Sequence, residues 1–324
     1  MKANIVEAIQ DAMRIALARD KDVVVLGEDV GKNGGVFRAT DGLQAEFGES
    51  RVFDTPLAES SIAGVGVGLA AYGLRPICEV QFGGFLYISL NQIASQAARL
   101  RLRTSGRLQA GMVIRAPYGG NVRTPDLHSD SLEALFAHTP GVKVAMPSTP
   151  YNAKGMLLAA IDDPDPVVFL EPMRIYRGLR AEIPDGHYTV PLGEARIARE
   201  GQDVTVVAYG AETQTALEAA ELLASDGIFC EVVDLQTISP LDAQTILASV
   251  AKTGRAVVVH EAVRQAGMGA EIAALIQEQA FYSLAAPVQR VTGWNTPFPF
   301  VQAEHLYVPG AAHIAQAVRR ALRD

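Results

Sequence analysis

Carboxylates occur at two places in the chain where they could take part in chemistry. Glu28 and Asp29 end the apolar segment KDVVVLGED, and Glu59 stands in FDTPLAESS, before a long run of Gly, Ala and Val. A carboxylate at a helix N-terminus is stabilised by the helix dipole, so capping alone could explain Glu59. Ligands of open α/β sheets, however, bind where strands end, and both acidic segments reach such an edge. We therefore expect a binding site there, with capping as the alternative.

The run that follows Glu59 contains a dinucleotide-like pattern. Residues 66–71, GVGLAA, fit G-x-G-x-x-A, but that pattern carries meaning only when its first Gly directly follows a strand. Here TPLAESSIAGV intervenes, so the glycines fall inside a helix, where each costs about 0.5–1 kcal/mol relative to Ala. We infer that Gly64 and Gly68 give this helix a smooth face for close packing, with another subunit as one partner, and we disfavour an NAD-dependent dehydrogenase.

Composition excludes several classes of protein. The 28 basic and 36 acidic residues give a formal charge of −8, and without a basic cluster this disfavours nucleic acid as a partner. The only two cysteines, Cys78 and Cys230, lie in apolar runs and are expected to be buried, reduced thiols rather than zinc ligands. The N-terminal segment has the pattern of an amphipathic helix, not of a secretory signal. The longest uncharged apolar stretch, 61–74, is about 14 residues, short of the ~20 that span a bilayer. We expect a soluble, cytoplasmic protein.

The apolar pattern predicts an α/β fold with two open, doubly wound sheets. Continuous apolar strands that alternate with helical segments are typical of parallel sheets covered on both faces. In the first domain, residues 1–185, we expect strands at 21–29, 75–82, 111–117 and 166–172, and helices at 60–72, 86–103, 131–138 and 149–161. Residues 186–200, rich in Pro and Gly, are expected to be a linker. In the second domain, residues 201–324, we expect strands at 203–210, 228–235, 255–262 and 287–293, and helices at 213–225, 241–252, 269–279 and 313–322.

A set of segments along nearly the whole chain resembles one family. These segments are GEDVG (27–31), FDTPLAE (53–59), EVQF (79–82), LHSDSLEALFAHTPG (127–141), PSTPYNAKGML (147–157), DPVVFLEP (165–172), KTGRAVVVHEA (252–262) and NTPFPF (295–300). They are similar in order and spacing to the beta subunit of the thiamine-diphosphate-dependent 2-oxo acid dehydrogenase decarboxylating component, and most of all to pyruvate dehydrogenase beta subunits. The resemblance implies a transketolase-like pyrimidine-binding domain, then a transketolase C-terminal-like domain.

The resemblance also implies roles for individual residues. Glu59 falls at the family position of the acid that hydrogen-bonds the pyrimidine nitrogen and promotes its imino tautomer. A low-dielectric wall, which the apolar helix supplies, strengthens such a bond. His128 falls where a histidine assists acyl transfer to the lipoyl group, and its ordinary pKa near neutrality suits proton transfer. Residues implied in binding the cofactor, besides Glu59, are Glu28, Leu57, Gln81 and Phe85. A solvated strand end for Glu28 and a core position for Phe85 are the alternatives.

The sequence lacks half of a thiamine diphosphate site. It contains no G-D-G motif for Mg²⁺ and diphosphate, so the resemblance places these on an alpha subunit, in an assembly of two alpha and two beta chains. The second domain is expected to serve assembly and to dock the lipoyl-bearing acyltransferase. A monovalent cation such as K⁺ is typical of the family, and its ligands would map onto Met112, Ala160, Ile161, Asp163 and Asp165. A plain helix end and turn at IDDPDP is an equal alternative. Where the family has DLRT, this chain has DLQT, so an ion pair of that Arg must be absent or replaced at Gln236.

Three functional hypotheses follow. The favoured one is an enzyme subunit that acts only with an alpha subunit in the oxidative decarboxylation of pyruvate and transfer of the acetyl group to lipoyllysine. The alternatives are the corresponding subunit for branched-chain 2-oxo acids and a non-catalytic docking subunit. A docking subunit would have no need of Glu59, Phe85 and His128 together at the positions that the family resemblance implies.

Overall fold

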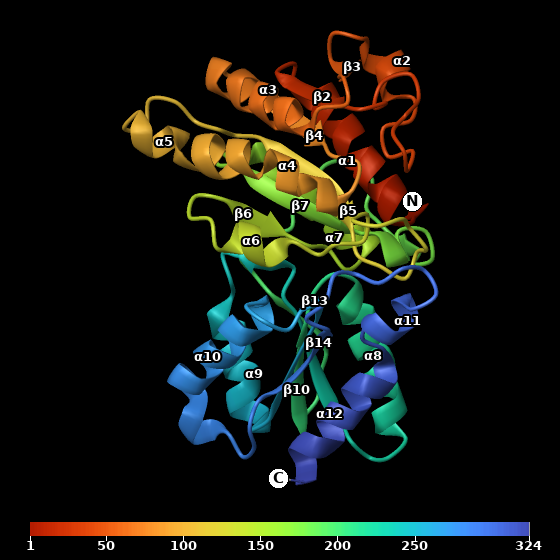
Figure 1. Cartoon of the computed structure of the whole chain (residues 1–324), viewed down its shortest axis with the longest axis vertical. Helices are drawn as coiled ribbons and strands as arrows, with labels where there is room; N and C mark the ends of the chain where they lie inside the picture. The colour runs from red at the N-terminus through yellow and green to blue at the C-terminus, as the bar shows by residue number, and fades with distance from the viewer. Residues whose placement is uncertain (324) are drawn as a thin grey trace. The chain divides into compact units, whose positions relative to one another are not determined.

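The computed structural model describes residues 1–323, which fold into two compact units (Figure 1). The first unit contains residues 1–119 and 127–192, and the second contains residues 120–126 and the chain from Gly193 onward. The division between Leu192 and Gly193 falls inside the segment expected to be a linker, part of which forms an edge strand of the second sheet. Asp324, the last residue of the expected second domain, lies outside the described residues.

A parallel sheet forms the centre of the first unit. The strands that the first unit contributes to it, in spatial order, are β6 (Lys143–Ala145), β7 (Val167–Pro172), β5 (Val113–Tyr118), β4 (Arg75–Glu79), β2 (Val23–Gly27) and β3 (Val52–Asp54). Strands β2, β4, β5 and β7 confirm the four predicted from apolar runs, and the three-residue strands β3 and β6 were not predicted. A separate antiparallel pair joins β1 (Lys2–Ala3) to β8 (Ala181–Glu182).

Two groups of helices cover this sheet on opposite faces (Figure 1). The helices of the first unit are α1 (Ile5–Arg19), α2 (Leu43–Phe47), α3 (Glu59–Tyr72), α4 (Leu86–Asn91), α5 (Leu100–Arg103), α6 (Glu133–Ala137) and α7 (Pro150–Asp162). Helix α1 packs on α7, and α3 packs on α4. Local sequence explains where they begin: Asn4 and Glu7 form a capping box for α1, and Thr149 caps α7 with Pro150 in its first turn.

The prediction of one continuous helix over residues 86–103 was wrong. After α4 the chain forms a π-helical turn, Gln92–Gln96, and a 3₁₀ turn, Ala97–Arg99, before α5. At this break the main chain of Ala98 meets Gly141, where a β-carbon would overlap the Ala98 carbonyl oxygen. The periodicity of apolar residues indicates which face of a helix is buried, but it does not indicate where the helix changes to a π-helical or 3₁₀ turn.

The glycines of α3 divide into two kinds. A β-carbon on Gly66 would lie 2.5 Å from Cys78 Sγ and 2.6 Å from Met112 Cε, so this glycine lets α3 pack closely on its own sheet. Gly68 is exposed, with nothing within 4 Å of such a carbon. The glycines lie inside a helix, as predicted, and the GVGLAA segment therefore does not form a strand-to-helix phosphate loop.

The second unit is a smaller α/β sandwich. Its strands follow the order β14 (Gln289–Gly293), β13 (Ala256–Val263), β10 (Val204–Ala208), β11 (Cys230–Asp234) and β9 (Arg196–Arg199). All pair in parallel except β9, which is antiparallel to β11 and was not predicted. Helices α8 (Ala211–Ala224) and α12 (Ala311–Arg323) pack together on one face, and α9 (Ala243–Thr253) and α10 (Met268–Ala280) on the other (Figure 1). The chain of this unit also contains the short helix α11 (Glu304–Tyr307) and the short strand β12 (Thr237–Ser239), which is not part of its five-stranded sheet.

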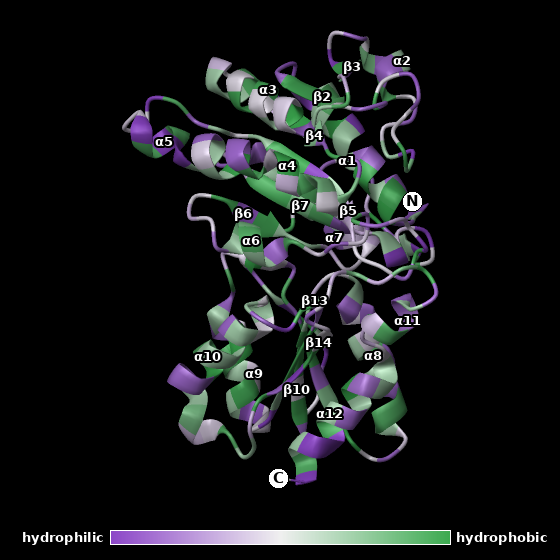
Figure 2. Cartoon of the chain, viewed as in Figure 1, coloured by the Kyte–Doolittle hydropathy of each residue, from purple (hydrophilic) through white to green (hydrophobic). Residues whose placement is uncertain are grey.

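Apolar residues concentrate in the strands of both sheets (Figure 2). The core of the second unit is built mainly from buried Val and Ala side chains of β10, β11, β13, α8 and α12. Cys78 and Cys230 are both buried and free, as predicted, and burial raises the pKa of the two thiols to about 12 and about 11. Within residues 1–323, no helix is long and apolar enough to cross a membrane.

Candidate active site

Two buried carboxylates in the first unit lie close enough for their charges to interact. Glu28 follows the last residue of β2, and Glu59 is the first residue of α3; the exposed fraction of each is only 6%. Burial raises the pKa of Glu28, and the negative charges of Glu59 and then Asp29 raise it further. A group that costs free energy to ionise in the apo chain is typical of a ligand site. The structure therefore brings together the two acids that the sequence singled out.

Two buried oxygen atoms beside these acids have no hydrogen-bond partner among the described residues. They are Glu28 Oε1 and Thr55 Oγ1. The backbone N–H of Thr55 donates to the carbonyl of Gly27 at 2.9 Å, which holds this residue next to Glu28. A buried polar atom without a partner costs about 1–3 kcal/mol, so the pair indicates a place that a ligand completes. Sequence reasoning missed Thr55, although its position directly after β3 and before a proline could have indicated it.

Backbone contacts fix the position of Glu59. The N-cap of α3, Ala58, makes no side-chain cap, and Glu59 lies in the first turn, where the helix dipole stabilises a carboxylate, so the alternative role at the helix N-terminus is compatible with the structure. In addition, the buried hydroxyl of Ser89 on α4 donates to the carbonyl oxygen of Glu59 at 2.8 Å. Asp29, next to Glu28, adopts a left-handed conformation with φ 57, which is uncommon for a residue with a side chain. Such local strain tends to persist where the surrounding structure serves a site.

Aromatic rings collect around His128. The centroid of its imidazole lies 4.4 Å from that of Phe82 and 4.9 Å from that of Phe85. Phe82 also meets Phe37 at 5.5 Å, and Phe37 meets Tyr176 at 5.3 Å. His128 is only partly buried, so its imidazole remains accessible beside an apolar wall. The structure thus joins the predicted residues Phe85 and His128, and it adds Phe82, which lies in the EVQF segment but was not singled out.

The approach of the His128 loop depends on Gly84. This residue lies in the 3₁₀ turn η1 (Gly83–Phe85), and a β-carbon on it would overlap the carbonyl oxygen of Leu127 and lie 2.9 Å from its carbonyl carbon. Only glycine allows the two backbones to meet this closely. Leu127 itself has φ 69, the left-handed region that is rare for leucine. The loop therefore reaches η1 in a constrained conformation that presents His128 to the rings.

A buried ionic cluster lies under this edge of the sheet. Arg115 on β5 makes a bidentate pair with Glu171 on β7, at 2.7 and 2.8 Å, and a second pair with Glu79 on β4. The hydroxyl of Tyr176 donates to Glu171, and burial holds the pKa of this tyrosine well above its usual value. Because Tyr176 also contacts Phe37, this ionic cluster supports the group of aromatic rings beside His128.

The remaining predicted cofactor residues lie at the same end of the sheet. Leu57 precedes α3 and is 79% exposed, which makes its side chain available to a ligand or to another chain. Gln81 follows β4 by two residues and is partly buried. Both roles stay predictions. The substitution at Gln236 belongs to the second unit, where its amide donates to the carbonyl of Glu194 at 2.8 Å, so a neutral hydrogen bond occurs at this position.

Each of the predicted cation ligands has a partner within the chain. The carbonyl of Ile161 accepts from Arg75 at 2.9 Å, and that of Ala160 accepts from the N–H of Asp163 at 3.3 Å. The carbonyl of Met112 accepts from Val167 at 3.0 Å. Asp163 pairs with Lys143, and Asp165 pairs with Arg101 at 3.0 Å. Among the described residues, no group of three or more His, Cys, Asp or Glu side chains could hold a metal ion. The monovalent cation remains a prediction that rests on backbone carbonyls.

Comparison with known proteins identifies the two domains and the family. Residues 1–178 match the model of the transketolase pyrimidine binding domain, and residues 193–314 match that of the transketolase C-terminal domain. The pyruvate dehydrogenase E1 component subunit beta of Bacillus subtilis is 54% identical over 317 residues, covering 98% of both chains, and that of Staphylococcus aureus is 51% identical with the same coverage.

Solved structures share the fold. One described as a split-gene transketolase, an inactive beta4 tetramer, superposes with a TM-score of 0.82 at 24% identity and covers 99% of this chain and 98% of its own. A mutant transketolase of Pichia stipitis gives 0.71 at 14% identity, and the match covers 46% of that longer chain. At these identities the two structures show the fold alone. Because the beta subunits of Bacillus subtilis and Staphylococcus aureus match nearly the whole chain at more than 50% identity, the chain belongs to the family of pyruvate dehydrogenase E1 component beta subunits, whose two domains are of the transketolase type.

Proposed function

We propose that this chain is the beta subunit of a pyruvate dehydrogenase that decarboxylates pyruvate oxidatively and transfers the acetyl group to a lipoyllysine of the acyltransferase. Relatives with that name match it over nearly their whole length. The single observation that carries the proposal is the buried pair Glu28–Glu59 with an unpartnered oxygen on Glu28. Two like charges held out of water are unfavourable unless a ligand with hydrogen-bond donors joins them.

Thiamine diphosphate fits this place by its chemistry. Its aminopyrimidine offers a ring nitrogen and an amino group, which match an acidic side chain and unpartnered acceptor atoms, and Phe85 and Phe82 offer apolar ring surface. When bound, the cofactor supplies an acidic thiazolium carbon and an electron sink for the loss of CO₂. Leu57, Gln81 and Phe85 would contact the pyrimidine and exclude water from it.

Each polar residue then has a task that this chain performs. The Glu59 carboxylate would share a proton with the pyrimidine nitrogen of a bound cofactor, and its buried, low-dielectric surroundings would strengthen that hydrogen bond. Glu28 would accept a further hydrogen bond, which would offset the free-energy cost of its burial. His128, accessible beside the rings, donates or accepts a proton during transfer of the acyl group. Ser89 and Gly84 position these groups and do not take part in the chemistry themselves.

The proposal includes partners that this chain requires. Mg²⁺ and the diphosphate would be held by an alpha subunit, in an assembly of two alpha and two beta chains in the cytoplasm. A monovalent cation, K⁺ for instance, would bind at the carbonyls of Met112, Ala160, Ile161, Asp163 and Asp165. The exposed Gly68 of α3, with the half-buried Gly64 one turn before it, would allow close contact with another subunit.

Co-expression with an alpha chain tests the proposal. The assembled complex is assayed with pyruvate and with branched-chain 2-oxo acids, in the presence of thiamine diphosphate and Mg²⁺. We expect turnover with pyruvate and a fall of about 10²–10⁴ in Glu59→Gln. The matched control is Glu49→Gln, the same chemical change at an exposed position, which should leave turnover unchanged. Preference for branched substrates would favour the branched-chain homologue, and unchanged turnover in Glu59→Gln would favour a docking subunit.

A further inference from the structure

Residues 120–126 come from the first half of the chain, yet they belong to the second unit. They follow strand β5, which ends at Tyr118, and they lead directly to Leu127 and His128. The peptide bond between residues 126 and 127 therefore ties His128 to a segment whose contacts lie in the second unit. The contacts that hold residues 120–126 also set the path by which the chain reaches His128.

Two buried carboxylates of the second unit bind the main chain of this segment. Glu261, near the end of β13, accepts a hydrogen bond from the backbone N–H of Gly120. Glu304, the first residue of α11, accepts one from the backbone N–H of Arg123 at 3.2 Å. Hydrogen bonds to an ionised acceptor are roughly twice as strong as those between neutral groups. Because both bonds are made to backbone groups, they fix the path of the chain and not the side chains of the segment.

One oxygen of Glu304 is left without a partner. The exposed fraction of this residue is only 2%, and Glu304 Oε1 is buried with no hydrogen-bond partner among the described residues. Burial of a polar atom that lacks a partner is unfavourable for stability. The carboxylate is therefore a poor choice for holding the fold together, and its bond to the segment needs another reason.

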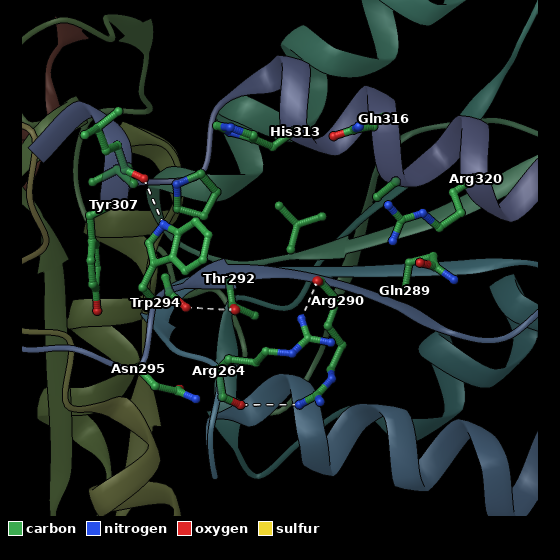
Figure 3. A pocket seen from close by; sticks show the side chains of 16 residues that line it. Arg264, Gln289, Arg290, Thr292, Trp294, Asn295, Tyr307, His313, Gln316 and Arg320 are labelled. Atoms are coloured by element: carbon green, nitrogen blue, oxygen red, sulfur yellow. Dashed lines mark hydrogen bonds between the residues drawn. The ribbon is translucent and has the colours of Figure 1, made fainter.

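The helix that carries Glu304 is held in place by its neighbours. Trp294, directly after β14, donates its indole N–H to the carbonyl of Leu306 on α11 at 3.0 Å (Figure 3). The ring of Tyr307, also on α11, lies 4.8 Å from that of Phe298 between centroids. A β-carbon on Gly120 would overlap the ring of Phe298, so the start of the segment packs directly against this aromatic pair. Glu304 thus reaches the segment from a fixed support.

The backbone of the segment adopts conformations that are uncommon for residues with side chains. Asn121 and Arg123 have φ of 63 and 62, and Leu127, the next residue after the segment, has φ 69. The left-handed region is sparsely populated outside Gly, Asn and Asp, and such residues persist where surrounding contacts over-determine them. Release of the Arg123 N–H from Glu304 would let this residue return to negative φ and redirect the chain toward His128.

We propose that Glu304 is a positioning residue for His128 in the acyl transfer. The inference rests on the proposed function, which assigns the transfer step to His128. Glu304 holds the main chain of Arg123, five residues before His128, and does not itself take part in the chemistry. Its loss should displace the imidazole and slow acyl transfer, whereas decarboxylation, which depends on Glu59, should continue.

Limited digestion of the full chain with trypsin tests the anchor without reference to any reaction. Trypsin cleaves after Arg123, which is exposed and is followed by Thr124, and mass spectrometry identifies the cut. We expect Glu304→Ala to be cut there roughly 10- to 100-fold faster, because cleavage follows the population of the opened segment and a hydrogen bond to a charged group is lost. Glu278→Ala, at an exposed glutamate of the same unit, is the matched control and should be cut at the normal rate.

Kinetics of the complex assembled with an alpha chain test the consequence. We expect Glu304→Ala to lower kcat for acetylation of a free lipoyl domain about 10- to 100-fold, since a reacting group displaced by about 1 Å can cost that much. The KM for the lipoyl domain and decarboxylation with an artificial electron acceptor should stay within about threefold, because the change affects one chemical step and not binding. Glu304→Gln keeps an acceptor oxygen at the same reach and should restore most of the rate, whereas Glu304→Asp, with the charge but one methylene shorter, should resemble Glu304→Ala.

Several results would overturn the inference. Normal tryptic cleavage in Glu304→Ala would show that the hydrogen bond does not hold the segment, and faster cleavage with normal acetylation would show that the segment does not position His128. An equal fall in acetylation and decarboxylation would indicate a general structural defect instead. If Glu304→Ala does not assemble, Glu304→Gln and Glu304→Asp decide, and equal rates in these two would contradict the inference. An unaltered complex without turnover of pyruvate would refute the proposed function, while the tryptic comparison would still decide whether Glu304 holds the segment.

Discussion

Gly84→Ala should separate the two halves of the proposed reaction. The new β-carbon would overlap the carbonyl oxygen of Leu127 and lie 2.9 Å from its carbonyl carbon, whereas carbon atoms pack best about 3.5–4.0 Å apart. The loop must therefore retreat by roughly 1 Å. His128 follows directly after Leu127, so its ring contacts with Phe82 and Phe85, now 4.4 and 4.9 Å between centroids, would loosen. Aromatic contacts of this kind contribute about 0.5–1.5 kcal/mol each.

The expected kinetic effect is selective. A displacement of about 1 Å in a reacting group can lower a rate about 100-fold. We expect acylation of a free lipoyl domain by the assembled enzyme to fall by about that factor. Decarboxylation with an artificial electron acceptor, which relies on Glu59, should stay within about threefold of wild type by the same argument, since α3 and Ser89 do not move.

Controls make the result interpretable. Gly178→Ala adds the same methyl group to an exposed glycine with open space around it and should affect neither assay. His128→Ala should resemble Gly84→Ala, whereas His138→Ala, at an exposed histidine of the same segment, should resemble wild type. If Gly84→Ala acylates the lipoyl domain at the normal rate, the loop contact does not position His128 and the reasoning is refuted.

Three further predictions concern stability and are measured by denaturant unfolding of the full chain. Gly66→Ala should lower the free energy of unfolding by about 1–3 kcal/mol, because its methyl group meets Cys78 and Met112. Gly68→Ala should raise it by about 0.5–1 kcal/mol, because the space around this residue is open. Equal effects of the two variants would contradict the assigned faces of α3. Arg115→Met should cost about 3–5 kcal/mol, since it leaves two buried glutamates uncompensated, and a neutral result would argue against the ionic cluster. Burial lowers the pKa of His260 to about 4, so between pH 6.5 and pH 4 this histidine is mostly protonated in the unfolded chain and mostly neutral in the folded chain. Stability should therefore fall by about 3 kcal/mol between pH 6.5 and pH 4, and His260→Gln should lack this component of the pH dependence.

Much of the fold could be predicted because its strands are buried on both faces. The segment at β2 consists of VVVLG, and such continuous apolar runs mark parallel strands independently of their neighbours. Strand β9 escaped prediction because RIAR is polar and pairs only at a sheet edge, where tertiary contact decides the conformation. The break after α4 escaped for a related reason, since it coincides with the approach of Gly141 from a distant part of the chain.

The site was predictable where a motif carries it and not where packing creates it. Glu59 and Glu28 could be identified because each ends or begins an element at one edge of the sheet. Ser89 and Gly84 could not, because their roles depend on a hydrogen bond to a distant carbonyl and a close approach of two backbones. Neither leaves a local pattern in the sequence.

Solvent exchange of the proton on the thiazolium carbon of bound thiamine diphosphate tests the role of Glu59 most directly. Quenched-flow NMR of the assembled complex in deuterated buffer measures this exchange without any substrate. We expect Glu59→Gln to slow the exchange by about 10²–10⁴, in line with loss of an acid–base group, while Glu49→Gln exchanges at the normal rate. An exchange rate in Glu59→Gln within a few-fold of wild type, with the cofactor bound, would contradict the account.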